Sequence, residues 1–369
     1  MPFHLKNAAS RPGVVIFGAA AIALLSPLSP VLAQPNSVLP GFEISSGTPL
    51  LSAAVSTGTV VGQGGNYSVP LGDGRTLWLL NNVWTGEKKA DGQTMVWGIM
   101  DGAAAFSAST VPYAQAGTLS YISEENGWPL PLLSGDLKEY SQLRKFWPRS
   151  GLCAGGMCYV FYSVMNNFGP EPYDYFRVGQ GVAWSGNPAG PYQKARVEER
   201  YRVWSDIEPA FGSALLCDDD GWIYVYGRAA AAPGEYGAEL ARVKPENLAS
   251  RDKYTYYAVE ASSGSWTADL SEAAMVLEGM PEDFSVSYNE YLKSYLAVYY
   301  DSEKFRVLAR EARYPWGPWS EPTPLLACAK GDYCYGAKEQ PGFAAEDGRK
   351  IFLTLEKKNA PYLYTITFK

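Results

Sequence analysis

A two-strand unit recurs five times along this chain of 369 residues, and the repetition limits the possible folds more than any other feature. Each copy has a strand of small residues, a turn rich in Gly or Asp, and a strand of aromatic and β-branched residues, which is the pattern of a β-hairpin. The copies pair Asn66–Pro70 with Thr76–Asn81, Ser150–Cys153 with Tyr159–Ser163, Phe211–Leu216 with Trp222–Gly227, Phe284–Tyr288 with Tyr295–Tyr300, and Gly342–Ala345 with Ile351–Leu355.

The spacing of these hairpins predicts an all-β, five-bladed β-propeller. Successive copies begin about 55 to 85 residues apart, which is room for a four-stranded sheet with its loops. The 26 Tyr, 14 Phe and 11 Trp favour pleated strands, and the 37 Gly and 26 Pro favour turns between them. A β-sandwich with added loops is the alternative, but a sandwich does not explain five similar hairpins.

The first 33 residues have the pattern of a signal peptide. A basic start without acidic residues precedes an uncharged apolar run, Val14–Leu25, and small residues end at Ala33. The run is too short to span a bilayer. We therefore expect a signal peptide over residues 1–33, a linker over 34–45 and one propeller domain over 46–369. The mature protein would be secreted or periplasmic, with no membrane span.

The histidine content excludes several kinds of catalytic site. The only histidine, His4, lies in the expected signal peptide, so the mature chain would have no Ser-His-Asp triad, Cys-His dyad, His-ligated zinc or histidine base. A net charge of −7 argues against nucleic acid as a partner. We expect no cofactor and no metal site. A calcium ion in the central channel stays open, although no EF-hand spacing supports one.

Four of the five cysteines form two closely spaced pairs. Cys153 and Cys158 are separated by four residues and Cys328 and Cys334 by five, so each pair could close across a tight turn. Disulfides fit an oxidising compartment. We expect these two disulfides and a free Cys217; the alternative is five unpaired cysteines in the core or in turns.

The propeller geometry places particular side chains around one end of the channel. If the small-residue strand is innermost, its start and the end of the next antiparallel strand lie on the same face of the ring. A ligand pocket would form on that face. The positions are Gly64–Tyr67, Trp147–Arg149, Asp206–Glu208, Asp283 and Glu339–Gln340 at strand starts, and Asn82, Ser163, Gly227–Arg228, Asp301 and Glu356 at strand ends.

Carboxylates with aromatic platforms are typical of a carbohydrate site, because sugars stack on rings and glycosidic cleavage uses two carboxylates. Asp206, Glu208 and Asp283 are the candidate catalytic residues, and we expect one of them to be partly buried and to hold a proton near neutral pH. The candidate substrate-binding residues are Tyr67, Asn82, Trp84, Trp147, Arg149, Arg228, Glu339 and Gln340. The structural alternative is that the rings are core and inter-blade packing and that the acids are solvated.

Several strings resemble a known family. Gly62–Leu71 and Asp73–Trp84 look like the opening of a secreted propeller family, long described only as a domain of unknown function, that includes bacterial endo-D-arabinanases. Trp147–Gly151, Phe211–Ala214, Phe284–Tyr288 and Tyr335–Pro341 are similar to further landmarks of that family. The resemblance implies a five-bladed, glycosidase-like propeller that acts outside the cytoplasm.

The chain departs from the arabinanase pattern at three positions. Gly64 and Asn82 stand where the resemblance implies two catalytic Asp residues, and Gln340 stands where it implies a His before Pro341. Neither Gly nor Asn can serve as a nucleophile or a general base. The family's chemistry therefore does not transfer directly to this chain.

Three hypotheses remain open. The chain is a secreted glycoside hydrolase-like enzyme acting on a polysaccharide or oligosaccharide by paired carboxylates, with Arg149 and Arg228 binding an anionic or hydroxyl-rich substrate. Alternatively, it is a catalytically inactive propeller that binds glycans or another surface. The third hypothesis is a structural secreted protein that binds no sugar.

Overall fold

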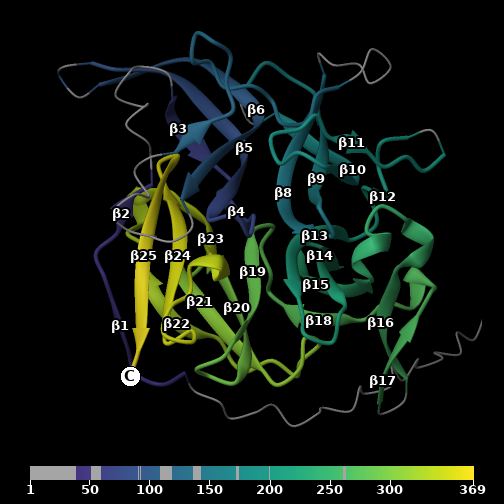
Figure 1. Ribbon diagram of the computed structural model, residues 1–369. Coiled ribbons are helices and arrows are strands. Elements are labelled where there is room, and N and C mark those ends of the chain that lie inside the picture. Colours follow the sequence, from purple (N-terminus) through teal and green to yellow (C-terminus); the bar gives the residue numbers. More distant parts are fainter. Residues whose placement is uncertain are drawn as a thin grey trace, which may run out of the picture.

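The computed structural model describes residues 39–50, 60–89, 91, 93–108, 119–135, 143–171, 174–198, 200–260 and 263–369. Five antiparallel sheets form a ring, so the predicted five-bladed β-propeller is confirmed. Figure 1 looks on to the ring, with β4, β8, β13, β19 and β23 around its middle. The expected signal peptide lies outside the described residues.

Each blade is built from consecutive strands, innermost first. Blade 1 contains β3 (Val60–Gly64), β4 (Tyr67–Pro70), β5 (Arg75–Lys88), β6 (Thr94–Ala108) and β7 (Ser120–Tyr121), and blade 2 contains β8 (Arg144–Ala154), β9 (Met157–Asn167), β10 (Tyr175–Ser185), β11 (Gln193–Lys194) and β12 (Trp204–Ser205). Blade 3 contains β13 (Ala210–Cys217), β14 (Ile223–Ala232), β15 (Glu235–Val243), β16 (Thr255–Glu260), β17 (Ser263–Thr267) and β18 (Met275–Glu278).

The last two blades complete the ring. Blade 4 contains β19 (Phe284–Asn289), β20 (Ser294–Asp301), β21 (Arg306–Ala312) and β22 (Thr323–Ala327), and blade 5 contains β23 (Cys334–Glu339), β24 (Lys350–Lys357) and β25 (Ala360–Phe368). The helical segments among the described residues are short 3₁₀ turns at Pro245–Asn247, Arg251–Lys253, Leu270–Glu272, Lys330–Asp332 and Pro341–Phe343. In the described part of the chain, no helix is long and apolar enough to cross a membrane.

The N-terminal strands close the ring by joining the last blade. β1 (Phe42–Ile44) and β2 (Thr48–Pro49) both pair with β25, so blade 5 combines the two ends of the described chain. β1 lies inside the segment expected to be a linker. The domain boundaries themselves stay a prediction.

Four of the five predicted hairpins have the expected strands, and the fifth differs. Gly342–Ala345 is not the inner strand of blade 5; β23 is, and it pairs with β24. Pro341 has no N–H to donate to a ladder, and it begins a 3₁₀ turn whose Phe343 stacks on Trp78 of blade 1. Glu339 and Gln340 therefore lie at the end of the inner strand, deeper in the channel than predicted.

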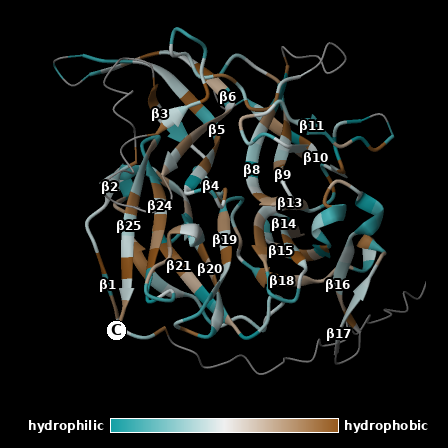
Figure 2. Cartoon of the chain, viewed as in Figure 1, coloured by the Kyte–Doolittle hydropathy of each residue, from teal (hydrophilic) through white to brown (hydrophobic). Residues whose placement is uncertain are grey.

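Apolar side chains between neighbouring blades form the core. The clusters include a group between blades 3 and 4 around Tyr226 and Phe284, and a group between blades 2 and 3 around Trp204 and Phe211. Figure 2 shows hydrophobic residues concentrated along the strands of the blades. Burial of these faces stabilises the ring by about 25 cal/mol for each Å² of apolar surface removed from water.

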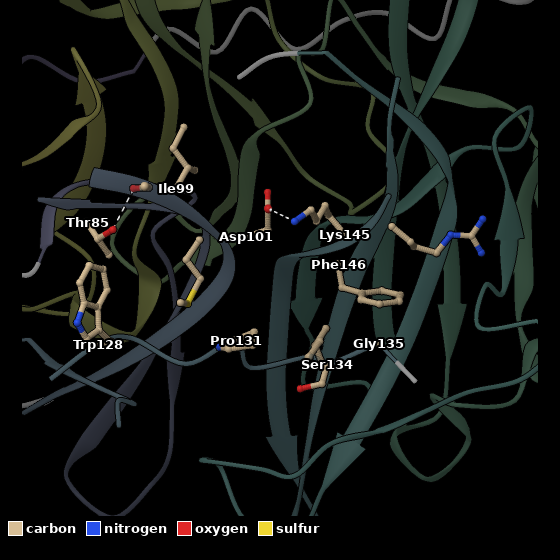
Figure 3. Close-up of a pocket in the computed structure, with 13 residues that line it drawn as sticks. Thr85, Ile99, Asp101, Trp128, Pro131, Ser134, Gly135, Lys145 and Phe146 are labelled. Carbon is tan, nitrogen blue, oxygen red and sulfur yellow. Dashed lines mark hydrogen bonds and ion pairs between the residues drawn. The ribbon is translucent and has the colours of Figure 1, made fainter. Parts of the chain in front are cut away.

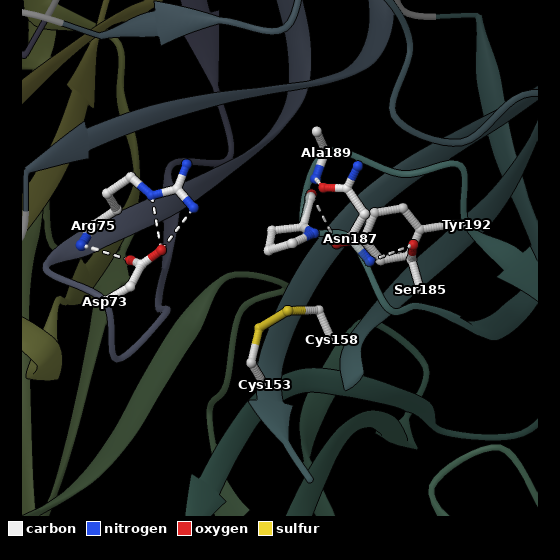
Figure 4. Close-up of a disulfide and its surroundings, with 9 residues drawn as sticks. Asp73, Arg75, Cys153, Cys158, Ser185, Asn187, Ala189 and Tyr192 are labelled. Atoms are coloured by element: carbon white, nitrogen blue, oxygen red, sulfur yellow. Dashed lines mark hydrogen bonds and ion pairs between the residues drawn. A yellow bond between two sulfur atoms is a disulfide. The ribbon is translucent and has the colours of Figure 1, made fainter. Parts of the chain in front are cut away.

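Both predicted disulfides are present. Cys153–Cys158 closes the β8–β9 turn, and Cys328–Cys334 joins the segment after β22 to the first residue of β23, while Cys217 is free. Figure 4 shows the first disulfide beside Tyr192 and the Asp73–Arg75 ion pair of 2.6 Å. It lies at the end of the inner strand, on the face opposite the predicted site.

Candidate functional site

We call the face on which the inner strands begin the mouth face. Asn82 and Trp84 of β5 open there on to a cavity of about 520 Å³. We call it the rim pocket; its lining residues are Asn82, Trp84, Tyr333, Tyr335, Lys358 and Asn359. It lies where blades 1 and 5 meet, and it combines three aromatic rings, two side-chain amides and one amine.

Backbone contacts hold the two walls of the rim pocket together. The β24–β25 turn contains Lys358 and Asn359, both with positive φ, and the carbonyl oxygen of Asn359 accepts a hydrogen bond of 2.9 Å from the amide of Gln63. A Cβ on Gly62 would lie 2.8 Å from the same oxygen, so a side chain there would push the turn away. Tyr335 Oη donates to Asn359 Oδ1 at 2.9 Å, which orients both side chains.

Gly64 and Asn82, the two departures from the arabinanase pattern, face each other across the β3–β5 ladder. A Cβ on Gly64 would lie 3.0 Å from Asn81 Oδ1 and 3.5 Å from Tyr335 Oη. A larger side chain would therefore point toward the rim pocket and crowd Asn81. Of the described residues that line this pocket, none has a carboxyl group.

A buried lysine links the rim pocket to the centre of the channel. Lys338 of β23 is 1% exposed, and its Nζ donates to the carbonyl oxygens of Gly65 at 2.6 Å and Gly336 at 2.7 Å. The same Nζ lies 3.9 Å from Glu356 Oε1 and 4.4 Å from the ring centre of Tyr67. The lysine therefore joins blade 5 to blade 1 through charge and hydrogen bonds.

Glu356 is a fully buried carboxyl next to this lysine. Asn66 donates to its Oε1 at 2.7 Å, while Oε2 has no hydrogen-bond partner among the described residues. Burial raises the pKa of Glu356 to about 7, although the charge of Lys338 and the bond from Asn66 act in the opposite direction. Burial therefore favours the protonated form of Glu356 more than it would be favoured at the surface.

Tyr67, Arg149 and Asp283, which the sequence predicted for the site, meet across the channel. Tyr67 Oη donates to Asp283 Oδ1, and Arg149 Nη1 donates to the same oxygen at 3.0 Å. The arginine also donates to Glu282 at 2.9 Å and to Ser163 at 2.9 Å. Blades 1, 2 and 4 are joined by this cluster.

The charges in this cluster keep Asp283 ionised. Burial alone would raise the pKa of Asp283, but the positive charges of Lys338 and Arg149 outweigh burial and lower it. Asp283 and Glu356 thus have pKa values displaced in opposite directions, and the charge of Asp283 contributes to raising the pKa of Glu356.

Asp206 and Glu208 do not join Asp283. Glu208 lies in a surface groove of blade 3, where its Oε1 accepts a hydrogen bond of 2.5 Å from Arg251. The side chain of Asp206 is 54% exposed, and its Oδ1 lies 3.9 Å from Nη1 of Arg202. Glu208 and Asp283 share no side-chain partner among the described residues. Burial opposes ionisation of Glu208, but Arg251 and Ser205 outweigh it and lower its pKa. The pKa values of Glu208 and Asp283 are thus both lowered, the opposite of what is expected of a proton donor, and the catalytic assignment stays a prediction.

Glu339 and Gln340 lie inside the channel wall. Gln340 donates to the Asn66 carbonyl at 2.8 Å and to Thr354 at 2.7 Å. Glu339 accepts a hydrogen bond of 2.6 Å from Ser287, and burial raises the pKa of Glu339 to about 7 against the effect of that bond. Both line a cavity of about 70 Å³. Their hydrogen bonds connect blades 1, 4 and 5.

Trp147 binds Asp101, which lines a second cavity that the sequence did not predict. Its Nε1 donates to Asp101 at 2.9 Å, and Asp101 pairs with Lys145 at 3.1 Å. Asp101 and Lys145 line a cleft of about 470 Å³ between blades 1 and 2, with Trp128 and Phe146 among its other walls. Figure 3 shows the Asp101–Lys145 ion pair in this cleft.

Arg228 is at the mouth face in blade 3, where it pairs in register with Ala210 at the start of β13. Its guanidinium carbon lies 3.4 Å from the ring centre of Tyr236.

The sequence analysis did not identify Tyr333, Tyr335 or Lys338 as site residues, although the string Tyr335–Pro341 resembles a landmark of the family. In the described residues, no group of three or more His, Cys, Asp or Glu could hold a metal ion.

Comparisons with known proteins agree with the fold. Residues 75–367 match the family described as "Domain of unknown function (DUF4185)". No curated protein matches the chain by sequence.

Among solved structures, a Bacteroides ovatus protein described as a candidate hydrolase has 15% identity and a TM-score of 0.62, covering 85% of this chain and 88% of its own. A GH43_1 enzyme from Xanthomonas citri has 15% identity and a TM-score of 0.51, covering 87% and 90%. A family 117 glycoside hydrolase from Zobellia galactanivorans has 11% identity and a TM-score of 0.53, covering 89% and 91%. At these identities the likeness is one of fold.

Proposed function

We propose that this chain, which belongs to the DUF4185 family, is a glycan-binding propeller whose ligand sits in the rim pocket. The observation that carries the proposal is the composition of that pocket: aromatic rings beside amide and amine groups, without a carboxyl group among its described lining residues. Rings stack on the C–H faces of sugars, and amides bind hydroxyl groups. Glycosidic cleavage would need two carboxyls flanking one bond.

The two disulfides support a place of action outside the cytoplasm, because disulfides persist in oxidising compartments. The ligand would then be an extracellular polysaccharide or oligosaccharide. The glycoside hydrolases that share the fold make sugars a reasonable ligand class, and one of them was crystallised with xylotriose.

A binding assay tests this proposal. Calorimetric titration with xylotriose, arabino-oligosaccharides and cello-oligosaccharides should detect binding of at least one of them. Tyr333 is 74% exposed, so Tyr333→Ala should fold normally. It should weaken binding about tenfold, the order expected for the loss of one stacked ring.

Tyr291→Ala is the matched control, since Tyr291 is 40% exposed and lies in the β19–β20 turn on the opposite face. The proposal is wrong if no oligosaccharide binds, or if the Tyr333 and Tyr291 variants weaken binding equally.

Hydrolysis is the second candidate function, and one observation favours it. Asp283 and Glu356 have pKa values displaced in opposite directions, as expected of a base and an acid. Product analysis on the same oligosaccharides separates the two functions. A hydrolase would release shorter sugars and lose nearly all turnover in Glu356→Gln, whereas the binding propeller releases none.

A further inference from the structure

In the described part of the mouth face, two guanidinium groups have no carboxylate within ion-pair distance. The guanidinium of Arg149 has both acceptors and counter-charges, since Glu282, Asp283 and Ser163 accept its hydrogen bonds. Arg177 and Arg228 differ from it, because neither forms an ion pair within the described ranges. These two residues come from blades 2 and 3.

Among the described residues, the acceptors that hold the guanidinium of Arg177 are backbone carbonyl groups. Its Nη1 donates to the carbonyl oxygen of Ser205 at 3.2 Å, and its Nη2 donates to the carbonyl oxygens of Asp206 at 2.7 Å and Glu208 at 3.1 Å. These bonds fix the guanidinium in place without neutralising its charge. The charged form is therefore preorganised for an anion.

Arg228 lies beside the same loop. It is the cross-strand partner of Ala210, which is two residues from the Glu208 carbonyl that Arg177 binds. Its guanidinium stacks on Tyr236, and its buried Nε has no hydrogen-bond partner among the described residues. A buried donor without an acceptor is costly, and an anion would supply the acceptor.

The electrostatics agree with this placement. Burial lowers the pKa of Arg177, and the positive charges of Arg149 and Arg228 contribute to the lowering, while Glu282 and Asp206 oppose it. The guanidinium groups of blades 2 and 3 are therefore close enough to repel one another. An anion bound between these guanidinium groups would reduce the repulsion between their positive charges.

We propose that Arg177 and Arg228 form an anion subsite at the mouth face, which binds the carboxylate or sulfate ester of an acidic sugar. This inference rests on the proposed function and gives its ligand a chemical class. The planar guanidinium groups suit the two or three oxygens of such groups. A sugar chain lying across the mouth face would present its hydroxyl groups to the rim pocket and its acidic group to this subsite.

The test uses three oligosaccharides of equal length with the full-length secreted protein. They are trigalacturonate, its carboxyl-reduced neutral trimer, and the same neutral trimer bearing sulfate esters. At least one acidic trimer should bind about tenfold more tightly than the neutral trimer, and the difference should shrink as salt is raised. Tighter binding of trigalacturonate would show that the subsite binds a carboxylate, and tighter binding of the sulfated trimer would show that it binds a sulfate ester.

Substitutions at Arg228 test whether this residue causes the preference for an acidic trimer. Arg228→Gln should reduce the affinity for the preferred acidic trimer to that for the neutral trimer. Arg228→Lys, which keeps the charge but loses the planar fork, should retain part of the preference. Arg313→Gln is the matched control, because Arg313 is an arginine over an aromatic ring, Tyr314, elsewhere in blade 4. Circular dichroism of each variant confirms folding.

The outcomes separate this inference from the proposed function. If the neutral and acidic trimers bind equally, or if Arg228→Gln keeps the preference, the anion subsite is wrong and glycan binding stands. If the acidic preference depends on Arg228 but Tyr333→Ala has no effect, the subsite stands and the rim pocket is wrong. If no trimer binds, the anion subsite is wrong, and the titrations with xylotriose, arabino-oligosaccharides and cello-oligosaccharides decide the proposed function.

Discussion

Replacing Glu339 by Gln should stabilise the protein at pH 8 much more than at pH 5. Glu339 is 4% exposed, and its carboxylate accepts a hydrogen bond from Ser287. Burial raises the pKa of Glu339 to about 7 from an ordinary value of 4.5. A folded-state pKa above the unfolded one means that the folded protein binds the proton more tightly. The stability that this proton contributes is complete below about pH 4.5 and is lost as pH rises through 7.

The size of the effect follows from the two pKa values. The difference between 4.5 and about 7 corresponds to about 3 kcal/mol, the cost of burying the ionised carboxylate above pH 7. Gln has nearly the same shape and no charge, so it removes that cost. The free energy of unfolding of Glu339→Gln, relative to the original protein, should therefore be about 2 to 3 kcal/mol more favourable at pH 8 than at pH 5.

Urea unfolding followed by tryptophan fluorescence at pH 5, 6, 7 and 8 measures this difference. Comparison at equal pH cancels the contributions of all other titrating groups. Glu346→Gln is the control, because Glu346 pairs with Arg349 and Lys350 at the surface and these cations lower its pKa, so its charge does not change in this range. An equal effect of Glu339→Gln at pH 5 and pH 8 would refute the reasoning from burial.

Three further changes test the fold and the buried cluster. Lys338→Met should lower the free energy of unfolding by about 3 to 5 kcal/mol in urea titrations, because it leaves a buried carboxyl group without its cation; a loss below about 1 kcal/mol would contradict this. Gly62→Ala should cost about 1 to 3 kcal/mol, seen as a lower Tm, because its Cβ would lie 2.8 Å from Asn359 O; an unchanged Tm would show that the turn relaxes freely. Replacing Cys153 and Cys158 by Ser should cost less than about 3 kcal/mol, because the closed loop is short; a larger loss would mean that the disulfide does more than close one turn.

Within the described part of the chain, the sequence by itself determined most of the blade hairpins and both short disulfide loops. A hairpin pairs segments that are adjacent in the chain, so strand patterns and turn residues were enough to identify β4–β5, β8–β9, β13–β14 and β19–β20. The two disulfides span five and six residues, and their spacing was equally readable. The prediction failed at β23, where the inner strand is separated from β24 by the 3₁₀ turn at Pro341 instead of by a tight hairpin turn.

The site was decided by contacts between blades. Tyr67 and Asp283 are 216 residues apart, and Asn66 and Glu356 are 290 residues apart, yet each pair is joined by a hydrogen bond. The sequence could place these residues at strand ends but could not decide which way each side chain turns, as Glu208 shows by pairing with Arg251. Local patterns fix strands because neighbouring residues share one sheet, whereas the position of charge in the channel depends on how five separately formed sheets pack around one axis.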